Sequence, residues 1–145
     1  DRPEPCDLAS DGPVADVPAD HRFCAEISWM AVKGIATGYD DGTFRPTAPV
    51  SRQASAAFLA RTAAVWEDEG RMPWKELELG PEGFSDVPPD HPFNDEISWL
   101  VAKGIATGYD DGTFRPTAPV SRQAKARFLS FTVVAYLPPV SPEPF

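Results

Sequence analysis

The sequence predicts a mostly α-helical protein made of two tandem helix–long loop–helix repeats that pack into a pseudo-symmetric helical bundle. The first observation is a duplication, because residues 33–54 return without a change as residues 103–124. The second is apolar periodicity at helical spacing on both sides of each copy. The third is size. A repeat of about 50 residues has only a marginal core alone, so we expect it to bury surface against its twin or against a partner.

The chain divides into five segments by composition and by the repeat. Between the repeats, apolar side chains in a stretch rich in glycine, proline and charge indicate a linker that docks on the body. The ends are rich in proline. The segments are an N-terminal arm (1–13), a first repeat (14–66), a docked linker (67–83), a second repeat (84–137) and a Pro-rich tail (138–145).

The two copies match unevenly along their length. The loop stretch is identical at 22 of 22 positions. Residues 16–34, which share their last two positions with it, match at 12 of 19, and residues 55–67 after it match at 4 of 13. A recent duplication alone would scatter the differences more evenly. We infer that the loop is held fixed either by its backbone geometry or by a shared ligand.

The first helix of each repeat follows a turn. Asp20 is a candidate N-cap, and Phe23, Ile27 and Met30 form one apolar stripe at helical spacing. Gly34 follows a lysine and is typical of the residue just past a helix C-terminus. The second repeat shows the same pattern seventy positions later.

The loop and second helix follow. Asp-Gly at position 42 favours a tight turn, and Pro46 and Pro49 keep the chain extended around Arg45. Ser51 is the expected N-cap of the second helix. The residues expected on the apolar face of that helix are Ala54, Phe58, Leu59, Thr62 and Val65.

The last helix, predicted over 121–137, is apolar around most of its circumference. Such a helix is usually covered on more than one side. We therefore expect a partner interface that includes Phe131, Val134 and Tyr136. Its cover would come from the linker, another chain or a further segment.

Composition excludes several classes of function. A net charge of −9 argues against nucleic-acid binding, which needs basic faces, and 42% hydrophobic residues indicate a globular chain. No apolar run is long enough to cross a membrane. The two cysteines, Cys6 and Cys24, fit one disulfide in an oxidising compartment, which would stabilise the fold by roughly 3 kcal/mol. The alternative is two unpaired buried thiols.

The repeats resemble those of the S-layer homology (SLH) family, in the actinobacterial style. The motifs that carry the resemblance are Phe84-Ser-Asp-Val-Pro, Glu96-Ile-Ser-Trp-Leu, Gly104-Ile-Ala-Thr-Gly-Tyr-Asp-Asp-Gly-Thr-Phe-Arg-Pro and Val120-Ser-Arg-Gln-Ala. The first repeat matches from position 14 onward. The resemblance implies a mostly helical fold in which three repeats commonly surround a pseudo-threefold axis and the second helices build the centre.

The resemblance also implies a function and a location. SLH modules hold secreted proteins non-covalently on cell-wall polysaccharide, here at the surface of a Gram-positive-type bacterium. The family's ligand-binding arginine, in Thr-Arg-Ala-Glu, corresponds to Arg52 and Arg122. In this chain the motif is Ser-Arg-Gln-Ala, and there are two repeats.

Several residues are candidates for binding an acidic or pyruvylated glycan. An arginine in the first turn of a helix opposes the helix dipole, and beside free N–H groups it makes an anion site. Each residue type has an alternative role. The arginines would instead form ion pairs with loop aspartates, and the tryptophans would pack between repeats. The tyrosines would cover the core. The full set is Arg52, Arg122, Trp29, Trp99, Tyr39, Tyr109, Asp40 and Asp110.

No enzyme, cofactor or metal site is predicted. The Asp40-Asp41-Gly42 run lacks the alternating oxygen ligands and the terminal glutamate of an EF-hand. His21 and His91 form no catalytic constellation and are expected to be capping or surface residues. The first functional hypothesis is therefore a non-catalytic cell-envelope anchor. The alternative is an extracellular protein–protein interaction module that binds another envelope protein, or copies of itself, through the last helix.

Overall fold

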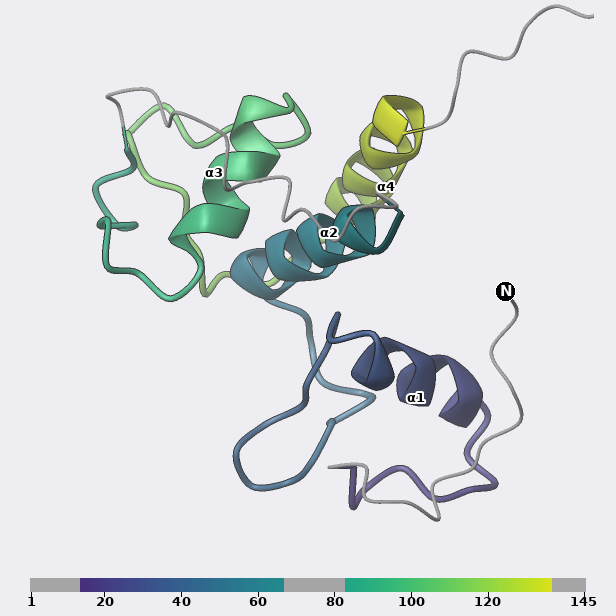
Figure 1. Cartoon of the computed structure of the whole chain (residues 1–145). Coiled ribbons are helices and arrows are strands. Elements are labelled where there is room, and N and C mark those ends of the chain that lie inside the picture. Colours follow the sequence, from purple (N-terminus) through teal and green to yellow (C-terminus); the bar gives the residue numbers. More distant parts are fainter. Residues whose placement is uncertain (1–13, 67–82, 137–145) are drawn as a thin grey trace, which may run out of the picture. The chain divides into compact units, whose positions relative to one another are not determined.

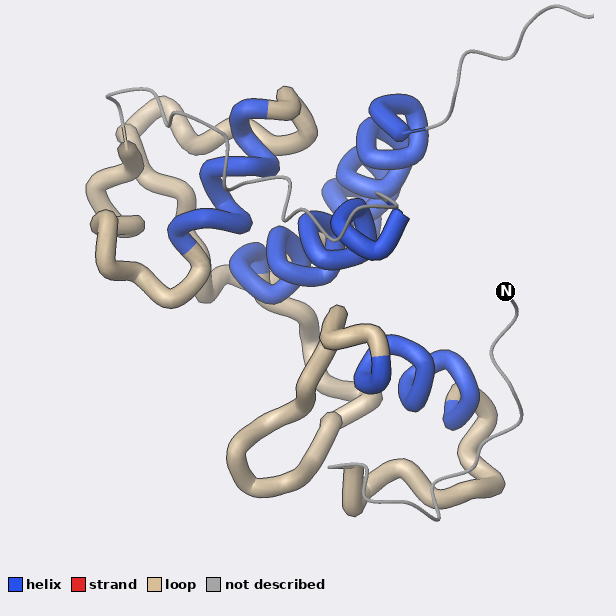
Figure 2. The backbone as a smooth tube through the Cα atoms, in the orientation of Figure 1, coloured by secondary structure: helices blue, strands red, loops and turns tan. Residues whose placement is uncertain are grey.

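The regular secondary structure of the described residues is helical, and long loops connect the helices. The computed structural model describes residues 14–66 and 83–136, without the side chains of residues 66 and 133–136. Within these ranges there are four helices, no strand, and one isolated antiparallel bridge between Ser51 and Pro119 (Figures 1 and 2). This confirms the predicted mostly α class. The helices are α1 (Cys24–Val32), α2 (Arg52–Trp66), α3 (Asn94–Ala102) and α4 (Arg122–Tyr136).

The first helix of each repeat begins later than the sequence predicts. Phe23 is the N-cap residue of α1 and makes no side-chain capping bond, so the assignment of Asp20 as N-cap is wrong. The three residues before α1 form turns instead. The N–H of His21 donates to the Pro18 carbonyl at 2.9 Å, and the His21 Nδ1 accepts from the Phe23 N–H at 3.1 Å. His91 does the same before α3.

Both first helices end in the predicted way. Gly34 and Gly104 have φ of 69° and 68°, a left-handed conformation that glycine adopts without steric cost. The N–H of Gly34 donates to the Ala31 carbonyl and the N–H of Ile35 to the Met30 carbonyl, the bond pair of a Schellman motif. The chain thus leaves α1 with its next apolar residue, Ile35, buried.

Serine caps the second helix of each repeat. Ser51 Oγ accepts from the N–H of Ala54 at 3.3 Å, and Ser121 Oγ accepts from the N–H of Ala124 at 3.2 Å. The predicted capping role of Ser51 is confirmed.

No helix in the described parts of the chain is long and apolar enough to span a membrane.

The chain divides into two compact units, and the boundary in the sequence lies between Pro49 and Val50. Unit 1 contains α1 and the first loop, and its buried cluster comprises Val14, Val17, Cys24 and Ile27. Unit 2 contains α2, α3, the second loop and α4, with a larger buried cluster to which all three helices contribute. The second helix of the first repeat therefore packs with the second repeat.

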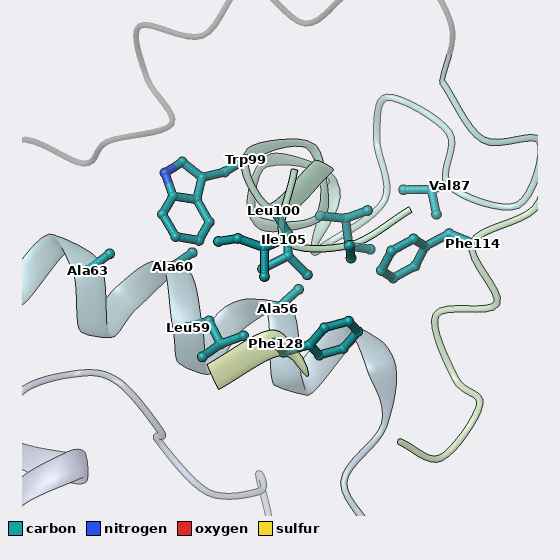
Figure 3. Packing of buried hydrophobic residues seen from close by; sticks show 12 residues of the cluster. Ala56, Leu59, Ala60, Ala63, Val87, Trp99, Leu100, Ile105, Phe114 and Phe128 are labelled. Carbon is teal, nitrogen blue, oxygen red and sulfur yellow. The ribbon is translucent and has the colours of Figure 1, made fainter. Parts of the chain in front are cut away.

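The contact between α2 and α3 is built on alanine. Ala56, Ala60 and Ala63 are fully buried, and Leu59 lies beside them. Figure 3 shows the Trp99 ring of α3 over Ala60 and Ala63, with the Phe128 ring of α4 close to Ala56 and Leu59. The predicted face of α2 is correct at Leu59 but is rotated elsewhere, because the small residues permit the close approach.

Candidate functional site

Each loop is fixed by one aspartate that precedes the first helix. In unit 1, the Asp16 carboxylate accepts from the N–H groups of Phe44 and Arg45 at 2.7 and 2.8 Å. In unit 2, Asp86 accepts from Phe114 and Arg115, both at 2.8 Å. The backbone hydrogen bonds lower the pKa of the Asp16 carboxyl. The same brace thus sets both loops.

A second network closes the turn of each loop. Asp41 accepts from the Thr43 N–H and hydroxyl at 3.0 and 2.6 Å, and from the Arg45 guanidinium at 2.8 Å. These bonds, led by the Thr43 hydroxyl, lower the Asp41 pKa to about 2. In the second loop, the corresponding bonds from Thr113 and Arg115 lower the pKa of Asp111.

Arg45 and Arg115 adopt φ values of 56° and 58°, which residues other than glycine rarely do. Each guanidinium lies over a tyrosine ring, Arg45 on Tyr39 at 3.9 Å and Arg115 on Tyr109 at 3.8 Å. The ion pair and the stacking compensate for the backbone strain. Because every member of this network lies within the 22 identical residues, loop architecture by itself accounts for a large part of that identity.

Arg52, the first residue of α2, lies in the second loop and not in solvent. Its Nε donates to the Phe114 carbonyl at 2.8 Å and its guanidinium NH₂ to the Thr107 carbonyl at 3.2 Å. The guanidinium also faces the rings of Phe114 and Tyr109 at 4.4 and 5.1 Å. Burial lowers the Arg52 pKa, and the residue is 8% exposed.

The backbone at the start of α2 completes this contact. The Arg52 N–H donates to the Ala118 carbonyl at 2.9 Å and the Gln53 N–H to the Pro116 carbonyl at 2.8 Å. We call the whole arrangement the arginine–loop contact. It consists of Arg52, Gln53 and the loop carbonyls of Thr107, Phe114, Pro116 and Ala118. Helix-end N–H groups and a guanidinium both find carbonyl acceptors there.

Arg122 begins α4 in the same sequence motif but is exposed. Neither arginine forms an ion pair with a loop aspartate among the described residues, so the predicted ion pairing is not found there. The loop arginines Arg45 and Arg115, which were not predicted as ion-pair partners, pair with Asp41 and Asp111 instead. Arg52 is enclosed by protein, which removes it from any glycan-binding surface of this structure.

The two tryptophans differ in the same way. Trp99 is fully buried in the cluster shared with α2, as the packing alternative predicts, and offers no face to a sugar ring. Trp29, at the equivalent position of α1, is partly exposed. The structure therefore leaves only Trp29 of this pair accessible to a ligand.

The remaining candidates lie on the surface of their loops. Tyr39 and Tyr109 are 48% and 40% exposed, so they cover the arginines rather than the core. Asp40 and Asp110 are exposed. No cluster of metal-ligating side chains occurs in residues 14–66 and 83–136.

The predicted interface and disulfide are only partly described. Phe131 is 47% exposed, and Leu129 beside it, which the prediction did not single out, is 56% exposed. The side chains of Val134 and Tyr136 lie outside the described residues. Cys24 is buried, whereas Cys6 also lies outside them, so the Cys6–Cys24 bridge stays a prediction.

Sequence reasoning missed the loop-bracing aspartates, although a signal was present. Asp16 and Asp86 open the segment that matches at 12 of 19 positions, and both precede Val-Pro. An aspartate kept in both copies ahead of an identical loop indicates an acceptor for loop N–H groups.

Two repeats of one helix–loop–helix design, each with the same braced loop, define a tandem-repeat module. The model of the S-layer homology domain family matches residues 15–54 and 83–124, more than half of the chain. The chain belongs to this family, as its motifs predict.

Named relatives are larger proteins. The chain is 32% identical over 110 residues to a cellulosome-anchoring protein of Acetivibrio thermocellus, covering 74% of this chain and 23% of that protein. It is 40% identical over 122 residues to S-layer protein EA1 of Bacillus anthracis, covering 83% of this chain and 12% of that protein. An S-layer protein of Bacillus thuringiensis subsp. finitimus is 27% identical over 114 residues, 79% of this chain and 13% of that protein. The chain thus spans less than a quarter of each.

Proposed function

We propose that this chain is a non-catalytic anchoring module at the bacterial cell surface, and that it binds an acidic cell-wall polysaccharide non-covalently. The observation that carries the proposal is the family match over both repeats. The names of the relatives, an anchoring protein and S-layer proteins, support a cell-surface role.

Arg122 is the residue to which we assign the binding of the glycan's acidic group. It is exposed and begins a helix, where N–H groups and the helix dipole favour an anion. Arg52 supports the assignment by analogy, since the same residue in the same motif donates two hydrogen bonds to oxygen acceptors. Trp29 and the exposed loop residues Tyr39, Tyr109, Asp40 and Asp110 supply further surface for sugar contacts.

The net charge of −9 makes the binding depend on local cations, because the chain as a whole repels an anionic polymer. We therefore expect binding that involves few charges and a specific site. Moderate salt will weaken it less than it weakens a polycation that neutralises many charges.

Co-sedimentation of the purified chain with cell-wall sacculi tests this function. The sacculi are used before and after removal of their secondary polymers, at two salt concentrations. We expect binding that is lost on stripping. Binding of equal strength to both preparations, or to neither, contradicts the proposal.

Paired variants locate the site. Arg122→Ala removes the proposed anion contact, and Lys103→Ala removes one positive charge from another exposed position. We expect the first to weaken wall binding about tenfold, the loss of one charged hydrogen-bonding group, and the second to leave it unchanged. Equal effects would assign the loss to net charge and remove Arg122 from the site.

The second candidate is an interaction module for other proteins. The observation that favours it is that two large apolar residues of α4, Leu129 and Phe131, are each about half exposed, on different faces of the helix. Exposed large apolar side chains are a common feature of protein interfaces. In this function the braced loop is purely structural, and wall polymers have no effect on the protein.

A further inference from the structure

Within unit 2, α2 packs on α3 and the second loop. Unit 1 and α4 contain the residues equivalent to the two sides of this contact. In unit 2, Trp99, Leu100 and Phe114 are fully buried at this contact. In unit 1, the equivalent residues Trp29, Met30 and Phe44 are all partly exposed. We call these three residues the acceptor surface.

The carbonyls of the first loop show the same difference. Arg52 donates hydrogen bonds to the carbonyls of Thr107 and Phe114 in the second loop. The equivalent carbonyls of Thr37 and Phe44 accept no hydrogen bond from any described residue. Because the first loop has the same sequence and the same bracing bonds, it presents the same oxygen acceptors in the same loop conformation.

The other half of the contact lies on α4. Ala56 and Leu59 of α2 belong to the buried cluster of unit 2, at 0% and 9% exposure. Their equivalents on α4, Ala126 and Leu129, are exposed, as is Arg122. We call Arg122, Ala126 and Leu129 the donor face. α4 is thus held in unit 2 by Phe128 and Thr132, with the donor face left uncovered.

We propose that copies of this chain associate head to tail, with the donor face of α4 in one copy seated on the acceptor surface of unit 1 in the next. The occupant is a second copy because each copy carries both halves, and because the arginine motif and the loop that join them are identical to those already joined in unit 2. Arg122 takes the place of Arg52 and donates to the Thr37 and Phe44 carbonyls of the next copy. An Arg122 engaged in this way is not available to a glycan, so association and wall binding through Arg122 compete.

The association differs from the internal contact at several positions. Ala60 and Ala63 of α2 correspond to Ser130 and Val133 of α4, and Leu100 of α3 corresponds to Met30 of α1. One further difference concerns an ion pair. Arg61 of α2 pairs with Glu96 of α3 at 3.0 Å, whereas α4 has Phe131 at the equivalent position and α1 has Glu26. The copy-to-copy contact therefore lacks this ion pair and is more apolar. Since the two surfaces that meet are different, the interface is heterologous and extends into rings or open chains.

The test measures the molar mass of the full chain by light scattering and sedimentation across a wide concentration range, without wall material, so its outcome is independent of glycan binding. We expect a mass that rises with concentration. A monomer at every concentration overturns the proposal. That result would also be obtained if α4 packed on unit 1 of the same chain, and it would overturn the proposal in that case too.

Complementary variants test the head-to-tail geometry. Arg122→Ala with Leu129→Glu disables the donor face, and Trp29→Ala disables the acceptor surface. Glu26→Arg is a second acceptor variant at an exposed position of α1, in case Trp29→Ala perturbs unit 1. Each is expected to weaken association at least about tenfold, as for central interface residues, while Lys103→Ala has no effect.

Mixing gives the decisive result. A donor-disabled copy retains a working acceptor surface, and an acceptor-disabled copy retains a working donor face. The two together should form a 1:1 dimer and nothing larger, although each is monomeric alone. A donor-disabled variant that stops association while both acceptor variants leave it intact would indicate a symmetric α4–α4 contact and overturn the proposal.

Discussion

Arg52 and Arg122 have the same neighbours in sequence and opposite surroundings in the structure. Arg52 is held by two loop carbonyls and aromatic rings, whereas Arg122 is exposed. Local sequence sets the helix start and the cap for both, but the fate of the guanidinium depends on which loop lies opposite. Residues of this kind show how far a motif alone predicts a role.

The arginine pair gives a matched stability prediction. Arg52→Ala should lower the free energy of unfolding by about 3 kcal/mol, because the buried Phe114 carbonyl and the part-buried Thr107 carbonyl lose their donor and the rings lose a packed guanidinium. Arg122→Ala should change it by less than about 0.5 kcal/mol, as for other exposed positions. Urea unfolding of dilute protein, monitored by circular dichroism, measures both. Equal losses would mean that Arg122 is also buried in solution.

The loop aspartates predict loss of stability in acid. The folded-state pKa of Asp16, Asp41 and Asp111 lies below the ordinary value of 3.8. Their contribution is therefore complete above about pH 5, where the unfolded carboxyls are also ionised, and is lost progressively as the pH falls toward 2. Urea unfolding at a series of pH values should show stability falling over this range.

Asp41→Asn should flatten that dependence, because it removes the carboxyl whose pKa is lowered to about 2. Asp40→Asn is the control, since the adjacent Asp40 carboxylate accepts no hydrogen bond from the described residues. If the two variants lose stability with pH alike, the turn network is not the source of the acid sensitivity.

At the scale of elements, sequence patterns predicted most of the local features, although not the start of α1, where Asp20 is not the N-cap. The Schellman ends at Gly34 and Gly104 and the serine caps are local hydrogen-bond arrangements, and they were predicted correctly. The buried face of α2 was not. Periodicity gives weight to large apolar residues such as Phe58, which is only partly buried, whereas the contact is made by Ala56, Ala60 and Ala63. Alanine contributes little to a periodic apolar pattern. The buried face of α2 could therefore be identified only once its partner helix was known.

Two glycines of the second repeat are needed for different reasons. A Cβ on Gly108 would lie 2.8 Å from Cδ1 of Phe84 and 2.9 Å from the Thr113 carbonyl oxygen. A Cβ on Gly104 would meet no atom within 4 Å, but its φ is 68°. Gly108→Ala should therefore cost about 2–3 kcal/mol through overpacking, and Gly104→Ala only about 1 kcal/mol through backbone strain.

Thermal unfolding of the two glycine variants checks this order. The Phe84 ring also packs on Phe114 at 5.4 Å, so Gly108→Ala should disturb the near-ultraviolet circular dichroism of the aromatic core. Gly104→Ala should leave that spectrum unchanged. A larger loss of stability from Gly104→Ala would show that the left-handed turn, and not the ring contact, limits the fold.

On the scale of the whole molecule, the repeats of the sequence and the compact units of the structure do not coincide. The identical stretch made two equal repeats predictable, and the matching loop geometry of the two units reflects it. The small size of each repeat predicted packing of one repeat against the other. It did not indicate that α2 would be the element that packs with the second repeat, because that depends on a contact between residues such as Ala60 and Trp99, far apart in the chain. The burial of Arg52 was unpredictable for the same reason, whereas packing between repeats was one of the two alternatives for Trp99.

This division predicts unequal stability of the two units. Among the residues that the structure describes, the buried cluster of unit 1 has four members and that of unit 2 has twelve, including Trp99 and Phe114. Hydrogen exchange measured by mass spectrometry should therefore show α1 opening at lower free energy than α3, although the two helices have the same length. If the Cys6–Cys24 bridge forms, a reducing agent should speed exchange in unit 1 and leave α3 unchanged, because the bridge restricts only the chain around α1. Cys24→Ala should then exchange alike with and without the reducing agent. Equal protection of α1 and α3 would mean that the two units unfold together, and that an additional interface in solution stabilises unit 1.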